Sequence, residues 1–217
     1  MADETTAGGV VTETVLEARY LANGTRWTGR GALSSTHRLY DAAGIPIVRP
    51  AAGMTEVLTA RLCLASDLAD LARSCLLGSA ERPCLRCEKC VRKELITAAI
   101  TGGALPRLLI QNMLAVPAMT AKMRVPPPLF VQDMLEYALA RVDVAGTPLE
   151  SVKELLAPTL ESTAWAERYY TPALEDEVPE RFRDDIATEI FKRLEPMGPE
   201  DIEVVETWDA AARVPSS

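Results

Sequence analysis

The sequence predicts an α/β fold in its N-terminal half, a four-cysteine loop near the middle, and a mostly helical C-terminal region. Three observations carry this prediction. Two segments rich in β-branched residues precede residue 50, and four of the five cysteines lie between residues 75 and 90. Beyond Gly102 and Gly103, helical periodicity with proline punctuation replaces the strand signals.

The composition is that of an ordinary globular chain, with 217 residues, 48% apolar residues and 25% charged residues. The net charge of -8 argues against general nucleic-acid binding, because neutralising a phosphate backbone requires a basic excess. The N-terminus carries no signal-peptide pattern, and no apolar run reaches membrane-spanning length. We therefore expect a cytoplasmic protein without a membrane partner, in which clustered cysteines bind metal rather than form disulfides.

The N-terminal half is predicted to be a partial α/β domain at residues 10–125, after a disordered stretch at 1–9. Strands are predicted at residues 10–21, where the end of the segment fits a helix as well, and at 45–48, and a glycine-bearing loop is predicted at 23–31. Helices are predicted at 34–43, from 56 onward with a kink or restart at 66–67, and at 88–100. Thr55 is the expected N-cap of the second of these helices.

The C-terminal half is predicted to be a helical region at residues 126–214, followed by a tail at 215–217. Three consecutive prolines at 126–128 mark the joint. Helices are predicted at residues 130–142, 148–156, 180–194 and 199–212. Trp165, Tyr169 and Tyr170 are interpreted as an aromatic cluster for the core or for a subunit contact.

Four cysteines have the spacing of a metal site: Cys75, Cys84, Cys87 and Cys90. A single turn can bring four such thiolates to one tetrahedral ion, and zinc is the metal that prefers this closed shell. A closed shell leaves no position for water, so the zinc would be structural rather than catalytic. An iron–sulfur cluster is the alternative, although the usual Cys-Pro continuation is missing. Cys63 lies outside the group.

Five cations crowd the same loop of an otherwise acidic protein: Arg82, Arg86, Lys89, Arg92 and Lys93. One interpretation is that they stabilise the negative charge of a zinc tetrathiolate. The other is that one or two of them, Arg92 first, face an anionic ligand such as a phosphate. Both interpretations can hold together.

The cysteine loop and several segments before it resemble a known protein family. The Cys84-x-x-Cys87-x-x-Cys90 spacing after Ser74-Cys75, with the basic pair that follows, resembles the C-terminal zinc knuckle of 7-cyano-7-deazaguanine synthase. That enzyme is an N-type ATP pyrophosphatase of the adenine nucleotide alpha-hydrolase-like superfamily. The segments at residues 36–39, 44–45, 50–53 and 56–59, with Trp27, are similar to deazaguanine-synthase-like proteins. The resemblance covers roughly residues 25–100.

The resemblance implies a truncated adenine nucleotide alpha-hydrolase-like portion that completes an ATP-dependent ligase. Members of this superfamily adenylate a carboxylate, release pyrophosphate, and let ammonia or another nucleophile attack, which forms an amide or nitrile-type product. Their phosphate loop, Ser-Gly-Gly-x-Asp-Ser, holds the leaving pyrophosphate through glycine amides. This sequence does not contain that loop. We therefore expect a partner protein to supply it, so that ATP and Mg²⁺ bind only in the assembled pair.

The residues expected to bind the small carboxylate substrate are Trp27, Arg30, His37, Arg38, Thr55 and Glu56. Trp27 with neighbouring arginines could stack on a purine or clamp a carboxylate, or simply form an aromatic lid over the core. His37 is the only histidine, and a lone helical histidine is more often a partly buried polar residue than a ligand-binding one. No catalytic residue is assigned. The competing hypothesis is a non-catalytic, zinc-stabilised protein-binding module derived from the same fold.

Overall fold

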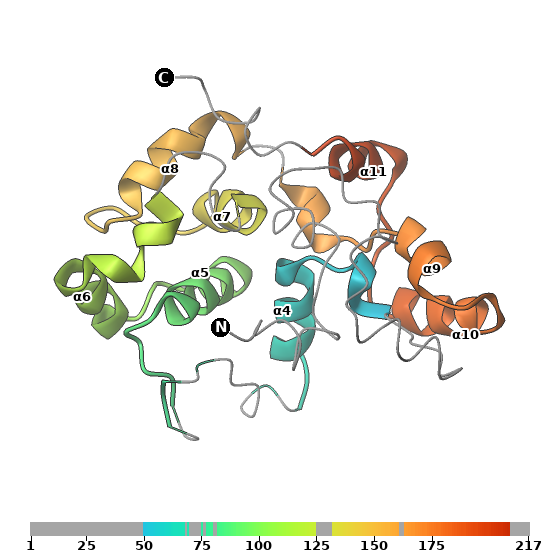
Figure 1. Cartoon of the computed structure of the whole chain (residues 1–217), viewed down its shortest axis with the longest axis horizontal. Coiled ribbons are helices and arrows are strands. Elements are labelled where there is room, and N and C mark those ends of the chain that lie inside the picture. The colour runs from blue at the N-terminus through green and yellow to red at the C-terminus, as the bar shows by residue number, and fades with distance from the viewer. Residues whose placement is uncertain are drawn as a thin grey trace, which may run out of the picture. The chain divides into compact units, whose positions relative to one another are not determined.

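The computed structural model describes residues 50–67, 69, 75, 77–79, 82–124, 132–160 and 163–208 (Figure 1). Several sequence predictions fall outside these residues. They are the N-terminal stretch at 1–9, the strands at 10–21 and 45–48, the loop at 23–31, the helix at 34–43, the proline joint at 126–128 and the tail at 215–217.

Regular structure in the described part of the chain is helical. The α-helices are α4 (Glu56–Leu64), α5 (Glu88–Thr101), α6 (Arg107–Ala115), α7 (Gln132–Leu139), α8 (Glu150–Leu156), α9 (Pro172–Glu177), α10 (Glu180–Phe191) and α11 (Pro199–Glu206). The 3₁₀ turns are η2 (Pro50–Gly53), η4 (Pro117–Met119), η5 (Ala121–Arg124), η6 (Ala157–Thr159) and η7 (Ala164–Glu167). Across the described ranges, β pairing is limited to an isolated parallel bridge between Tyr169 and Pro196.

The chain divides into two compact units, and the boundary falls within α4. The described part of the first unit is residues 50–59 and 167–208. The described part of the second consists of residues between 60 and 166 and contains α5, α6, α7 and α8. It also contains all four clustered cysteines.

The core of the second unit is formed where α5 and α7 lie side by side (Figure 1). Leu95 and Ile96 of α5 are fully buried, as are Leu135 and Leu139 of α7. Leu135 and Leu139 are four residues apart on α7, and Leu95 is four residues after the buried Val91 on α5, so each pair lies on one face of its helix. The packing fixes α5, which has Cys87 at its N-cap position and Cys90 in its first turn.

The α6 helix is held to the same unit by Leu109 and Met113, both of which are fully buried. They are four residues apart and therefore lie on one face of the helix. The opposite face exposes Leu108 and Leu114. The buried pair gives α6 a fixed position, which matters for the cysteine site described below.

The first unit is organised around Tyr169. Its hydroxyl donates a hydrogen bond to the carbonyl of Pro50 at 2.9 Å, and its ring meets Phe191 edge to face at 5.9 Å between centroids. A Cβ on Gly53 would lie 2.5 Å from the Cζ of Tyr169, so only glycine allows the ring this close. An ion pair between Arg168 and Asp201, at 2.5 Å, ties α11 to the same segment.

The helical prediction is confirmed in outline for the described residues. Thr55 caps α4 as predicted, because its hydroxyl accepts a hydrogen bond from the amide of Leu58 at 3.0 Å. The α4 helix ends at Leu64, before a turn at Ser66, where the sequence predicts a kink or restart. The helix predicted at 88–100 is α5, one residue longer.

Other helices are shorter than predicted. The α7, α8 and α10 helices begin or end a few residues inside the ranges 130–142, 148–156 and 180–194. The last predicted helix, 199–212, is α11 up to Glu206, and its residues from 209 onward are outside the described part. The α6 and α9 helices are not among the predicted ones.

Among the described residues, no helix combines the length and the apolar character needed to cross a lipid bilayer.

Candidate metal centre

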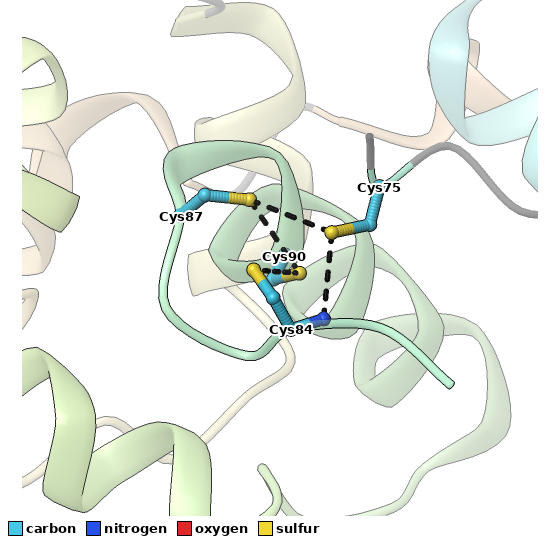
Figure 2. A group of neighbouring side chains, drawn as sticks. All are labelled: Cys75, Cys84, Cys87 and Cys90. Carbon is cyan, nitrogen blue, oxygen red and sulfur yellow. Dashed lines mark hydrogen bonds between the residues drawn. The ribbon is translucent and has the colours of Figure 1, made fainter. Parts of the chain in front are cut away.

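The four predicted cysteine ligands lie together in the second unit (Figure 2). Cys75 and Cys84 come from the loop before α5, Cys87 is the residue that caps α5, and Cys90 is in its first turn. Figure 2 shows the four side chains converging, with their sulfur atoms on the inside. Cys90 is buried, with 3% of its surface exposed, and the other three are half-buried.

The sulfur atoms have the spacing of ligands on a single tetrahedral ion. The separations are 3.9 Å from Cys75 to Cys87, 3.7 Å from Cys84 to Cys90 and 3.6 Å from Cys87 to Cys90. All four lie within 4.8 Å of one another. A tetrahedron with metal–sulfur bonds of about 2.3 Å has sulfur–sulfur edges of about 3.8 Å. The group could therefore hold one metal ion with small adjustments of the side chains.

Backbone geometry folds the loop back on itself so that the first cysteine meets the second. A Cβ on Gly78 would lie 2.5 Å from the carbonyl oxygen of Arg82 and 3.0 Å from the amide nitrogen of Cys84. Only glycine permits two backbone segments to approach this closely. The amide of Ser79 also donates to the carbonyl of Arg82 at 3.0 Å, which closes the turn.

Two backbone amides point at the sulfur atoms. The amide of Cys84 donates to the Sγ of Cys75 at 3.4 Å, and the amide of Arg86 donates to the Sγ of Cys84 at 3.3 Å (Figure 2 draws the first). Such N–H···S contacts favour the thiolate, which is the form that binds metal.

The electrostatic environment differs among the four thiols. The hydrogen bond from the amide of Cys84 lowers the pKa of Cys75 to about 6. Burial raises the pKa of the Cys87 and Cys90 thiols above the ordinary value. Cys75 is thus poised as a thiolate, whereas a metal ion must displace protons from the two cysteines of α5.

A hydrogen bond from α6 reaches the turn between Cys84 and Cys87. The side-chain amide of Asn112 donates to the carbonyl of Leu85 at 2.9 Å. Leu85 has φ of 53°, which is the left-handed region that residues with a Cβ rarely adopt. Asn112 is not among the predicted site residues, because it is 27 residues from Leu85 and no spacing rule connects them.

The predicted cations surround the cysteines along the chain. Arg82, Arg86 and Lys89 are exposed, and Arg92 and Lys93 are half-buried on α5. Four thiolates on a divalent ion would carry two net negative charges, and cations close along the chain are the groups that could offset them. That Arg92 faces a phosphate stays a prediction.

The predicted substrate residues are placed only in part. Trp27, Arg30, His37 and Arg38 lie outside the described residues. Thr55 and Glu56 belong to the first unit and are buried, with 3% and 8% of their surface exposed. The hydroxyl of Thr55 is engaged in the helix cap described above. Cys63, the fifth cysteine, is exposed on α4 and is not part of the group.

Chemically, the arrangement is a closed set of four soft ligands. Four thiolates complete a tetrahedral shell, so a bound ion has no open position for a water molecule or a substrate. The site can hold a metal and cross-link the loop to α5, but it offers no Lewis-acid position for catalysis.

Comparison with known proteins places the chain in a family. No significant match is found to a curated protein or to a solved structure. The profile of a family described as "Family of unknown function (DUF6395)" matches residues 35–209. That stretch contains the whole cysteine group and every described helix. Because the match spans well over half of the sequence, the protein belongs to the DUF6395 family.

Proposed function

We propose that the four cysteines bind one zinc ion and that this ion is a structural cofactor. The observation that carries the proposal is the sulfur spacing of 3.6–3.9 Å, which matches the edge of a zinc tetrathiolate. In a [4Fe–4S] cluster, by contrast, each cysteine binds a different iron of a sulfide-bridged cage, so the thiolates lie farther apart than on one ion. A single iron ion would fit the same geometry, and elemental analysis separates it from zinc.

The zinc ion would act here as a structural cross-link between the loop and α5. Cys75 and Cys84 lie in a loop with few buried residues, whereas Cys90 is buried at the start of a helix whose middle is in the core. One ion bonded to all four fixes the loop to the helix. Its binding energy is then part of the folding energy of this unit.

We further propose that the zinc-stabilised chain works through a partner protein, as a component of a split ATP-dependent ligase. Support comes from the likeness of residues 25–100 to deazaguanine-synthase-like proteins, together with the missing phosphate loop. The partner would carry Ser-Gly-Gly-x-Asp-Ser and bind ATP with Mg²⁺. The pair would adenylate a small carboxylate and form an amide or nitrile-type product.

The second candidate function is a non-catalytic, zinc-stabilised module that binds another protein. One observation favours it over the ligase. Of the expected substrate residues that the structure describes, Thr55 has its hydroxyl engaged in a helix cap and Glu56 is buried beside it. Thr55 therefore has a role in folding that needs no substrate.

A pyrophosphate assay separates the two candidates. The chain would be co-expressed with a candidate partner that carries the phosphate loop, and pyrophosphate release would be followed with ATP, Mg²⁺ and a panel of carboxylates. The ligase proposal expects release from the pair and none from either chain alone. A stable complex that releases no pyrophosphate with any carboxylate would favour the binding module instead. Zinc content is measured on the same samples, so the metal proposal stands or fails separately.

A further inference from the structure

The turn between two of the cysteine ligands holds a leucine in an unfavourable backbone conformation. Leu85 follows Cys84 directly and precedes Cys87 by two residues. Its φ of 53° is the one positive φ at a residue other than glycine in the described part of the chain. A Cβ in the left-handed region crowds the following carbonyl, so this conformation persists only where neighbouring groups hold it.

The peptide group that follows Leu85 is held at both ends. Its carbonyl oxygen, on Leu85, accepts the hydrogen bond from the Nδ2 of Asn112 at 2.9 Å. Its amide, on Arg86, donates to the Sγ of Cys84 at 3.3 Å. Because the peptide group is planar, the orientation of the carbonyl fixes the orientation of the amide. The contact from Asn112 therefore directs an N–H group at a metal-binding sulfur.

Asn112 is itself held in place by the core. It lies on α6 between Leu109 and Met113, both of which are fully buried. The backbone carbonyl of Asn112 accepts a hydrogen bond from the amide of Val116 at 2.8 Å, at the end of the same helix. A side chain on an anchored helix can act as a fixed reference point for the more exposed turn.

We infer that Asn112 is a positioning residue for the metal centre. It locks the peptide plane between Leu85 and Arg86, which keeps Leu85 in the left-handed conformation and the Cys84 sulfur hydrogen-bonded. This inference rests on the proposed zinc site. Without the amide of Asn112, the peptide plane can rotate, Leu85 can relax to an ordinary conformation, and Cys84 loses both its N–H donor and its alignment with the other three thiolates.

The experiment compares Asn112→Ala and Asn112→Asp with the wild-type full-length chain. Asn112→Asp keeps the shape of the side chain and removes its N–H donor. Gln111→Ala is the matched control, because it deletes the neighbouring amide on the exposed face of α6. Zinc affinity is measured by competition with a chromophoric chelator, and the ligand-field absorption of the Co²⁺-substituted protein reports the tetrahedral thiolate geometry.

Both Asn112 variants should bind zinc about tenfold more weakly, with altered Co²⁺ bands, while Gln111→Ala matches the wild type. A rescue variant distinguishes positioning from a general loss of stability. Leu85→Gly makes the left-handed conformation free of steric cost, so adding Asn112→Ala to it should weaken zinc binding by less than about threefold.

Wild-type affinity and spectrum in Asn112→Ala would overturn the inference and leave the zinc site intact. An equal tenfold loss in the Leu85→Gly background would also overturn it, because Asn112 would then act independently of the backbone conformation. A wild-type chain that binds no zinc would overturn the proposed site and this inference together.

Discussion

At the level of single residues, the four cysteines of the group contrast with the fifth. Cys87 is the N-cap residue of α5, and its Sγ lies 3.6 Å from the Sγ of Cys90 and 3.9 Å from the Sγ of Cys75. It therefore contacts sulfur atoms from both the helix and the loop. Cys63 is exposed and lies outside the group. The two residue positions therefore test whether the cysteine site contributes to folding.

Cys87→Ser should lose zinc and destabilise the chain by at least about 3 kcal/mol, part of the ~10–16 kcal/mol that structural zinc sites supply. Cys63→Ser should change the free energy of unfolding by less than about 0.5 kcal/mol, because an exposed thiol has few contacts to lose. Denaturant unfolding of the wild type and both variants, each purified in the presence of zinc, measures the two effects. Equal effects of the two substitutions would contradict the assignment of the ligands.

Glu94 is a second residue with a clear expectation. It lies on α5, one turn after Cys90, and partial burial raises the pKa of its carboxyl group. A raised pKa means that the folded state binds a proton more readily than the unfolded state, so ionisation of Glu94 lowers stability as the pH rises. The penalty is complete above the raised pKa and absent below the ordinary value.

Glu94→Gln should therefore raise the melting temperature at neutral pH by about 1–2 °C, a small shift because water still screens much of the carboxylate. The gain should shrink as the pH falls toward the ordinary carboxyl range. Glu154→Gln, on the exposed face of α8, is the matched control for the loss of one carboxylate. Lower stability of Glu94→Gln at neutral pH would mean that the carboxylate has a favourable contact after all.

At the level of elements, Gly53 joins η2, of which it is the last residue, to the segment before α9. The amide of Tyr170 donates to the carbonyl of Gly53 at 2.8 Å, and a Cβ on Gly53 would lie 2.6 Å from the carbonyl oxygen of Tyr170. Because that neighbour is backbone, it cannot move aside cheaply.

Gly53→Ala should destabilise the protein by about 1–3 kcal/mol through this overlap. Gly198→Ala is the matched control, since its Cβ would enter open space and its φ of -76° suits any residue. Thermal unfolding of the two variants compares them directly. If Gly53→Ala melted with Gly198→Ala at the wild-type temperature, the tight packing of Tyr169 and Tyr170 on Gly53 would be wrong.

The elements also show how far the sequence alone could go. The four-cysteine group was predictable in large part because Cys84, Cys87 and Cys90 are local and their three-residue spacing places sulfur atoms on one side of a turn and a helix start. Thr55 was predictable as a cap because capping depends on residues three positions away. Both predictions depend on residues that are only a few positions apart in the sequence.

Other features lack a local signal. The α6 sequence, Arg-Leu-Leu-Ile-Gln-Asn-Met-Leu-Ala, is apolar on several sides, so its pattern does not stand out as an amphipathic helix. The short α9 helix begins at Pro172 and ends shortly before Pro179, and prolines this close together usually indicate a loop. Proline is nevertheless well tolerated at the first position of a helix. The contact between Asn112 and Leu85 depends on tertiary packing across 27 residues.

At the level of the whole molecule, the two compact units would give the proposed zinc ion a localised role. The cysteine group and α5 belong to the second unit, whereas α10 and α11 belong to the first. A structural ion should therefore protect one unit far more than the other. The family match over residues 35–209 covers described parts of both, so family members are expected to share this division.

Chelation of the metal should accelerate backbone hydrogen exchange in residues 82–101 by at least about tenfold. The α6 helix, linked to the turn through Asn112, should follow to a smaller extent. Exchange in α10 should stay within about twofold of the metal-loaded protein. Hydrogen exchange is measured by mass spectrometry after chelation and again after zinc is added back. Equal acceleration of exchange in both units would contradict a zinc ion that stabilises only the second unit.

The most direct test of the central claim is X-ray absorption spectroscopy at the metal edge on the purified full-length chain, combined with elemental analysis. The four thiols within 4.8 Å of one another predict one zinc per chain with four sulfur ligands at about 2.3 Å and no oxygen ligand. Iron in place of zinc, fewer than four sulfur ligands, or folded protein that carries no metal would contradict it.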